Sequence, residues 1–151
     1  VGGSLPDLQL ADSEGASQSL GKLMGPKLTV VVFWNGAQPS AMQELIDLGS
    51  DVADRFSGHG VAVVGINVGD DPQLARALAK SANARFPILD DPDGAAFGQI
   101  ATKKIPRTYL VDATGKIVWL DIEYSRTTRR ELSQAIRYLL SHATAGKQPS
   151  P

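Results

Sequence analysis

The stretch IPRTYLVDATGKIV, residues 105–118, combines a proline, a strand pattern, a tight turn and a second strand pattern. Residues 107–111 are rich in β-branched and aromatic side chains, and Asp112-Ala113-Thr114-Gly115 is typical of a turn. Residues 116–122 return as a partner strand. This stretch therefore predicts a β-hairpin near the C-terminal end of the chain.

Two apolar runs upstream indicate the rest of the sheet. Residues 28–34 (LTVVVFW) and 61–68 (VAVVGINV) contain almost no polar side chains, which is typical of strands buried on both faces of a parallel sheet. Helical patterns lie between and after them. We expect these helices to bury Met42, Leu45, Ile46, Val52, Ala53, Phe56, Leu74, Ala75, Leu78, Ala79, Leu132, Ala135, Ile136, Leu139 and Leu140. The sequence predicts an α/β domain whose mostly parallel central sheet has helices on both faces and ends in the hairpin and a helix.

Composition limits the possible functions. The chain has 151 residues, and we expect one domain over residues 1–142 followed by a polar, disordered tail or linker over residues 143–151. Its 15 Lys and Arg against 16 Asp and Glu lack the basic excess that nucleic-acid binding normally needs. The longest apolar run, residues 30–34, is far too short to insert into a membrane.

Three stretches together resemble the thioredoxin-like superfamily, and within it the TlpA/ResA-like, AhpC/TSA-related thiol-disulfide oxidoreductases. They are residues 5–15 (LPDLQLADSEG), residues 30–34 (VVVFW) and the opening stretch, residues 105–118. The resemblance implies a thioredoxin-like fold over residues 4–142 and a cis-proline at Pro106, beside the family's active site. It also favours an exported, periplasmic or membrane-tethered bacterial protein.

The sequence departs from this family at the catalytic motif. The family's Cys-x-x-Cys would fall at Gln38 and Ala41, but this chain reads Gln38-Pro39-Ser40-Ala41 and contains no cysteine anywhere. Dithiol exchange needs one thiolate to attack and a second to resolve the mixed disulfide, and a peroxidase needs one reactive thiolate. We therefore assign no catalytic residue and predict a redox-inactive binding domain rather than an enzyme.

The resemblance also places a partner-binding groove, which would hold an extended peptide or a protein segment. Its walls would be Trp34, Asn35, Gly36 and Ala37 on one side, and Ile105, Pro106 and Arg107 on the other. Ser40 followed by Gln43 fits a capping box at the start of the next helix.

Glu44 matches a carboxylate that tunes the cysteine pair in ResA-like members. Because this chain has no thiol, we interpret Glu44 as a carboxylate in an early helical turn, where the helix dipole favours negative charge.

Two other interpretations remain open. Ala37 and Ser40 have Cys-x-x-Cys spacing, so an oxidoreductase could have lost its cysteines by engineering, although this pair is one residue out of register with the family motif. Alternatively, the chain is a structural module of a larger protein.

Neither a cofactor nor a metal is expected. The carboxylates of Asp90, Asp91 and Asp93 lack the ligand spacing of a calcium loop and are interpreted as a turn.

Overall fold

The computed structural model describes residues 3–12, 14–38, 40–99, 107–121 and 125–146. Within them, seven strands form one sheet in the order β2-β1-β5-β4-β3-β6-β7. The strands are β1 (Gln9–Ala11), β2 (Ser17–Ser19), β3 (Leu28–Trp34), β4 (Val61–Val68), β5 (Ile88–Asp91), β6 (Arg107–Asp112) and β7 (Ile117–Asp121). The helices are α1 (Ala41–Leu48), α2 (Asp54–Phe56), α3 (Pro72–Ser81), α4 (Ala95–Gly98) and α5 (Arg126–Gly146), with 3-10 turns at Leu20–Leu23 and Ser57–His59.

The sheet is mixed, as predicted, but it is not mostly parallel. Only the pairings of β3 with β4 and of β4 with β5 are parallel in the described part of the chain. The pairings β1–β2, β1–β5, β3–β6 and β6–β7 are antiparallel. The prediction was wrong because β1 and β2 are three-residue strands with little apolar pattern, and because β6 returns directly beside β3. The predicted hairpin is confirmed as β6 and β7.

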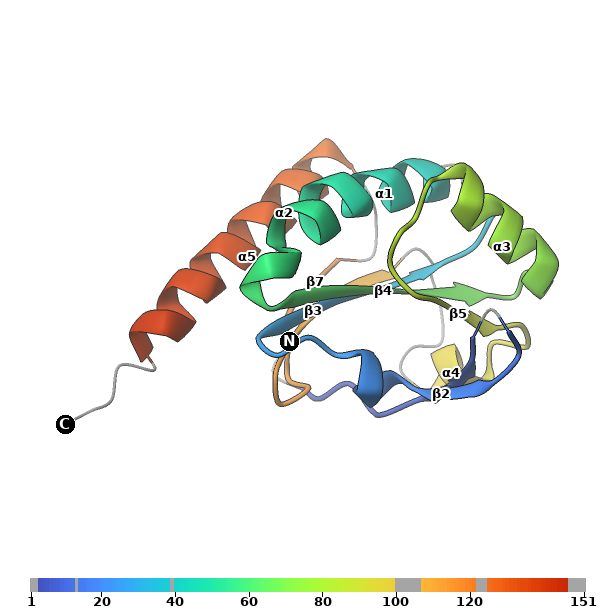
Figure 1. Cartoon of the computed structure of the whole chain (residues 1–151), viewed down its shortest axis with the longest axis horizontal. Coiled ribbons are helices and arrows are strands. Elements are labelled where there is room, and N and C mark those ends of the chain that lie inside the picture. The colour runs from blue at the N-terminus through green and yellow to red at the C-terminus, as the bar shows by residue number, and fades with distance from the viewer. Residues whose placement is uncertain (1–2, 13, 39, 100–106, 122–124, 147–151) are drawn as a thin grey trace.

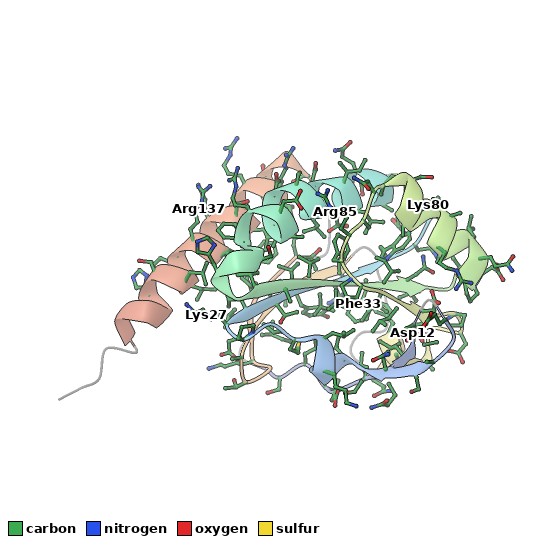
Figure 2. All side chains as sticks on the ribbon, viewed as in Figure 1. Asp12, Lys27, Phe33, Lys80, Arg85 and Arg137 are labelled. Atoms are coloured by element: carbon green, nitrogen blue, oxygen red, sulfur yellow. The ribbon has the colours of Figure 1, made fainter. Side chains whose placement is uncertain are left out.

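Different elements cover the two faces of the sheet (Figure 1). Helices α1, α2, α3 and α5 lie on one face, whereas the N-terminal segment and the short α4 lie on the other. Strand β3 lies between β4 and β6, and all seven of its residues are buried. Its side chains alternate between two cores: Val32 and Trp34 face α1, and Phe33 packs against Phe97 of α4. Figure 2 shows Phe33 inside the molecule, while Lys80, Arg85 and Arg137 point outward.

The expected helix over residues 40–56 is divided. Between α1 and α2 the backbone forms a π-helix, Gly49–Ala53, and the hydroxyl of Ser50 lies 3.4 Å from the carbonyl oxygens of Ile46 and Asp47. A serine hydroxyl at this position competes for the carbonyls that a regular α-helix uses.

Two sequence expectations about the helices need correction. Ile46 and Leu74 are 43% and 49% exposed, so they lie on the outer sides of their helices and not in the core. Helix α5 continues to Gly146, and the division into a domain over residues 1–142 and a tail over residues 143–151 stays a prediction. Residues 147–151 lie outside the described residues.

Candidate functional site

The loop after β3, where the family motif would lie, is held by its own hydrogen bonds. The Asn35 side chain accepts from the Ala37 backbone N–H at 2.7 Å and donates to the Val68 carbonyl at 2.7 Å. The Gln38 N–H donates to the Asn35 carbonyl, and the Ala41 N–H donates to the Gln38 carbonyl, each at 3.1 Å. The loop therefore has a defined shape as it enters α1.

Asp70 ties this loop to the end of the neighbouring strand, β4. One of its carboxylate oxygens, Oδ2, accepts from the Gly36 backbone N–H at 2.7 Å and from the Asn67 side chain at 2.9 Å. A Cβ on Gly36 would come within 2.6 Å of Leu78 Cδ1 and 3.2 Å of this same oxygen, so a larger residue would have to displace the ends of these two side chains. Asn67 and Asp70 were not predicted as site residues. The available signal was that parallel strands end at one edge of the sheet, which brings the residues following two such strands together.

The start of α1 differs from the predicted capping box. Ser40 is the N-cap residue, but its side chain makes no capping hydrogen bond. The Gln43 side chain instead donates to Asp47 Oδ1 at 2.9 Å, one turn further along the helix. Gln43 thus reaches forward along α1, so the reciprocal bonds of a capping box do not form.

Glu44 lies in the first turn of α1, as interpreted from the sequence, but its side chain is buried. It is 1% exposed, and Thr108 Oγ1 of β6 donates to its Oε2 at 2.7 Å. Its other oxygen, Oε1, has no hydrogen-bond partner among the described residues. Burial raises the pKa of Glu44 to about 7; the bond from Thr108 opposes the rise, and the charges of Asp121 and Asp47 add to it. Desolvation therefore outweighs any effect of the helix dipole.

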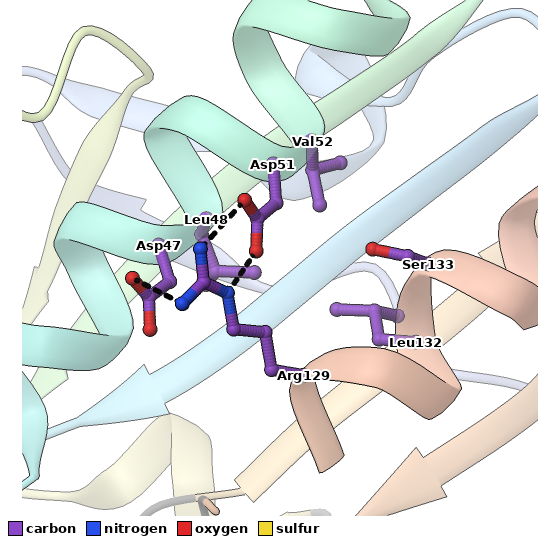
Figure 3. A pocket seen from close by; sticks show the side chains of 7 residues that line it. All are labelled: Asp47, Leu48, Asp51, Val52, Arg129, Leu132 and Ser133. Atoms are coloured by element: carbon purple, nitrogen blue, oxygen red, sulfur yellow. Dashed lines mark hydrogen bonds and ion pairs between the residues drawn. The ribbon is translucent and has the colours of Figure 1, made fainter. Parts of the chain in front are cut away.

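The N-terminal part of α5 is fastened to α1 and to the π-helix that follows it by an arginine (Figure 3). Arg129 binds the Asp51 carboxylate through two nitrogens: Nη2 donates to Oδ1 at 3.0 Å, and Nε donates to Oδ2. Its Nη1 lies 3.5 Å from Asp47 Oδ1. The cavity next to this arginine measures about 10 Å³, which is room for roughly one water molecule. We interpret this contact as structural.

The predicted site residues fall into three groups. Gly36 and Ala37 are exposed, while Asn35, Gln38, Ser40 and Arg107 are half-buried. Trp34 and Ala41 are completely buried, so Trp34 lies beneath the loop and cannot touch a partner directly. Of the second predicted wall, Arg107 is the residue that the structure describes, and the sheet register places it opposite Phe33, one residue before Trp34. Pro39, Ile105 and Pro106 lie outside the described residues.

The aspartates at the end of β5 form a turn. Asp91 accepts from the backbone N–H groups of Ala96 and Phe97 at 3.1 and 2.8 Å, and Asp93 accepts from that of Ala95 at 3.0 Å. These bonds fasten the first turn of α4. The described residues contain no group of His, Asp and Glu side chains arranged to hold a metal ion.

None of the helices within the described ranges has the length and apolar character needed to cross a bilayer.

Comparisons with known proteins agree with this architecture. The model of the AhpC/TSA family matches residues 1–120 of the chain. Thiol-disulfide oxidoreductase ResA from Bacillus cereus is 21% identical over 118 residues, which are 78% of this chain and 67% of that protein.

Solved bacterial structures share the fold. A structure from Bacteroides thetaiotaomicron has a TM-score of 0.83 at 25% identity; the alignment covers 93% of this chain and 90% of the Bacteroides chain. One from Chlorobium tepidum has the same TM-score at 22% identity, covering 92% and 96%. A secreted disulfide oxidoreductase of Mycobacterium tuberculosis, described as homologous to E. coli DsbE, has a TM-score of 0.73 at 22% identity, covering 88% and 96%. The resemblance to TlpA/ResA-type proteins of thioredoxin-like fold is confirmed.

Proposed function

This chain belongs to the AhpC/TSA family, yet it has no cysteine, and we propose that it is a redox-inactive domain that works by binding. In this proposal an extended peptide or protein segment lies against the loop at residues 35–38 and the start of β6. The observation that carries the proposal is the complete absence of cysteine from a chain that keeps the family scaffold.

The chemistry of the family supports the redox part of the proposal. Thiol-disulfide exchange proceeds by attack of a thiolate on a disulfide sulfur, and a second thiol then releases the mixed disulfide. At the two motif positions this chain has Gln38 and Ala41. An amide and a methyl group can neither attack a disulfide nor carry the two electrons of a dithiol.

The geometry of the loop supports the binding part. Gly36 and Ala37 are exposed, but their backbone N–H groups are anchored by Asp70 and Asn35. A surface held in place before binding loses little conformational entropy when a partner arrives. The backbone of Arg107, at the start of β6, pairs with Phe33 near the end of β3, and in the proposal this part of β6 borders the same segment.

An insulin-reduction assay tests the redox part and distinguishes the two possible motif registers. We expect no turnover above the protein-free background for the natural sequence. Restoring cysteines in the family register, Gln38→Cys with Ala41→Cys, should create measurable dithiol activity. The matched pair Ala37→Cys with Ser40→Cys has the same spacing but should remain inactive, because it is out of register. Turnover by the unaltered chain would refute the proposal, and activity of the second pair alone would favour engineered loss of cysteines.

A binding experiment tests the surface. Peptides are selected from a random-peptide display library against the immobilised chain, and the affinity of a selected peptide is measured in solution. Gln38→Trp and Arg107→Glu should each weaken binding about tenfold or more, as expected for central contacts of an interface. Lys80→Glu changes charge on the outer side of α3 (Figure 2) and is the control. The surface assignment fails if neither site variant weakens binding while both remain folded.

A further inference from the structure

One buried hydrogen bond joins the two segments that flank the proposed binding surface. Glu44 lies in the first turn of α1, directly after the loop, and Thr108 is the second residue of β6, next to Arg107. Thr108 Oγ1 donates to Glu44 Oε2 at 2.7 Å. This Glu44–Thr108 contact therefore holds the start of α1 against the start of β6.

Only one of the two carboxylate oxygens of Glu44 accepts a hydrogen bond from the described residues. Glu44 Oε1 is buried and has no hydrogen-bond partner in the described part of the chain. Strand β3 contributes no charge, since Val32 is the residue opposite Thr108 in the register. An ionised carboxylate in such a place lacks both hydration and sufficient hydrogen bonds, which disfavours its charged form.

The charged groups around Glu44 add to this effect. Asp47 on α1 and Asp121 on β7 are the two neighbours whose negative charges oppose ionisation of Glu44. Asp121 lies opposite Thr108 in the β6–β7 register. From α5, Arg129 is directed to Asp47 and Asp51. These surroundings therefore favour the neutral, protonated form of Glu44 while its side chain stays buried.

We propose that protonation of Glu44 controls binding at this surface: the neutral acid can stay buried between α1 and β6 in the binding-competent arrangement, whereas the ionised carboxylate favours an arrangement in which α1 and β6 separate and water reaches it, which weakens binding. The charged carboxylate gains hydration only when water reaches it between α1 and β6. This inference rests on the proposed function, because it assumes that the partner lies across both segments. The transition falls near neutral pH, since the pKa of Glu44 is raised to about 7.

The size of the effect follows from linkage. Coupling to a single proton changes an affinity by at most about tenfold per pH unit. We therefore expect the affinity of the selected peptide to fall about three- to tenfold between about pH 6 and about pH 8.5. The natural chain should show this fall, whereas Glu44→Gln, which keeps an acceptor for Thr108 but cannot ionise, should bind equally at both pH values.

Hydrogen exchange in the free chain measures the contact without any partner. After correction for intrinsic rates, the amides at the start of α1 and of β6 should exchange several-fold faster at the higher pH. Glu44→Gln should abolish this difference, and Asp93→Asn, an exposed carboxylate in the β5–α4 turn, should keep it. If Glu44→Gln does not fold, Asp121→Asn provides the test, because it should move the transition to lower pH.

The outcomes separate this inference from the proposed function. A peptide that binds with the same pH dependence to the natural chain and to Glu44→Gln would overturn the inference and leave the proposed function intact. Equal exchange profiles for the two chains would overturn it as well. If no peptide can be selected at either pH, the proposed function fails and the control of binding fails with it, even where the exchange profile still depends on Glu44.

Discussion

Two buried carboxylates, Asp91 and Glu44, differ in the hydrogen bonds that they accept. Asp91, before α4, accepts two backbone N–H groups and closes the first turn of that helix. Glu44, in the first turn of α1, accepts one hydroxyl and leaves its second oxygen without a partner among the described residues. Asp91 is the last residue of β5, and Glu44 lies in the first turn of α1, six residues after Gln38. We therefore expect the loss of Asp91 to destabilise the fold, and we expect the raised pKa of Glu44 to make the free energy of unfolding depend on pH.

The largest expected effect is the loss of pH dependence in Glu44→Gln. Glu44 has an ordinary pKa of 4.5 when unfolded and about 7 when folded. Between these values the folded chain binds the extra proton, so the free energy of unfolding decreases as pH rises from about 5 to 8. The decrease attributable to Glu44 is at most about 3 kcal/mol.

Urea unfolding at several pH values measures this decrease. The difference between the natural chain and Glu44→Gln isolates Glu44 from all other titrating groups. Parallel curves for the two chains across this pH range would show that Glu44 ionises normally in the folded state.

The second effect is a loss of stability in Asp91→Ala. The substitution leaves the buried N–H groups of Ala96 and Phe97 without their acceptor, which should cost about 2 kcal/mol. Urea unfolding near pH 7 measures the loss. Asp93→Ala removes an exposed carboxylate that accepts only from Ala95 and should cost less than about 1 kcal/mol. Equal losses for the two variants would contradict the distinction between a buried and an exposed acceptor.

Much of the fold around these carboxylates could be predicted from the sequence. The runs 28–34 and 61–68 indicated β3 and β4, and the turn at residues 112–115 indicated the β6–β7 hairpin. In that turn Asp112 accepts from Thr114 and Lys116; burial alone would raise the pKa of Asp112, but these hydrogen bonds hold it below its usual value. Such signals are readable because all the residues involved are close together in the sequence.

Features that depend on distant partners could not be predicted. Glu44 meets Thr108 across 64 positions, and Gly36 meets Asp70 across 34. A glutamate in a first helical turn suits solvent as well as a core, so periodicity alone cannot show that it is buried. The exposure of Leu74 could not be predicted for a related reason. Helical spacing identifies an apolar face of a helix, but it does not show how much of that face the sheet covers.

A smaller effect is expected for Thr108→Val, which removes the hydroxyl bound to Glu44. The bond from Thr108 lowers the pKa of Glu44, so its loss should move the pH transition upward by about half a pH unit and cost about 1 kcal/mol. An NMR titration of the Glu44 carboxyl carbon measures the midpoint. Thr29→Val, which removes a buried hydroxyl that accepts from Gly25, should leave the midpoint unchanged. A downward movement in Thr108→Val would mean that the hydroxyl does not stabilise the charged form.

The smallest effect concerns charge alone. Asp121→Asn keeps an oxygen that can accept from Thr128 but removes one of the two negative charges that disfavour ionisation of Glu44. Because protein and solvent screen such charges strongly, the Glu44 midpoint should fall by only about 0.3 pH units. Asp54→Asn, which alters an exposed carboxylate paired with Arg85, should not move it. A fall larger than the rise expected for Thr108→Val would mean that charge repulsion, not burial, sets the pKa of Glu44. Glu44 would then differ from Asp91 by its neighbours rather than by its missing hydrogen bond.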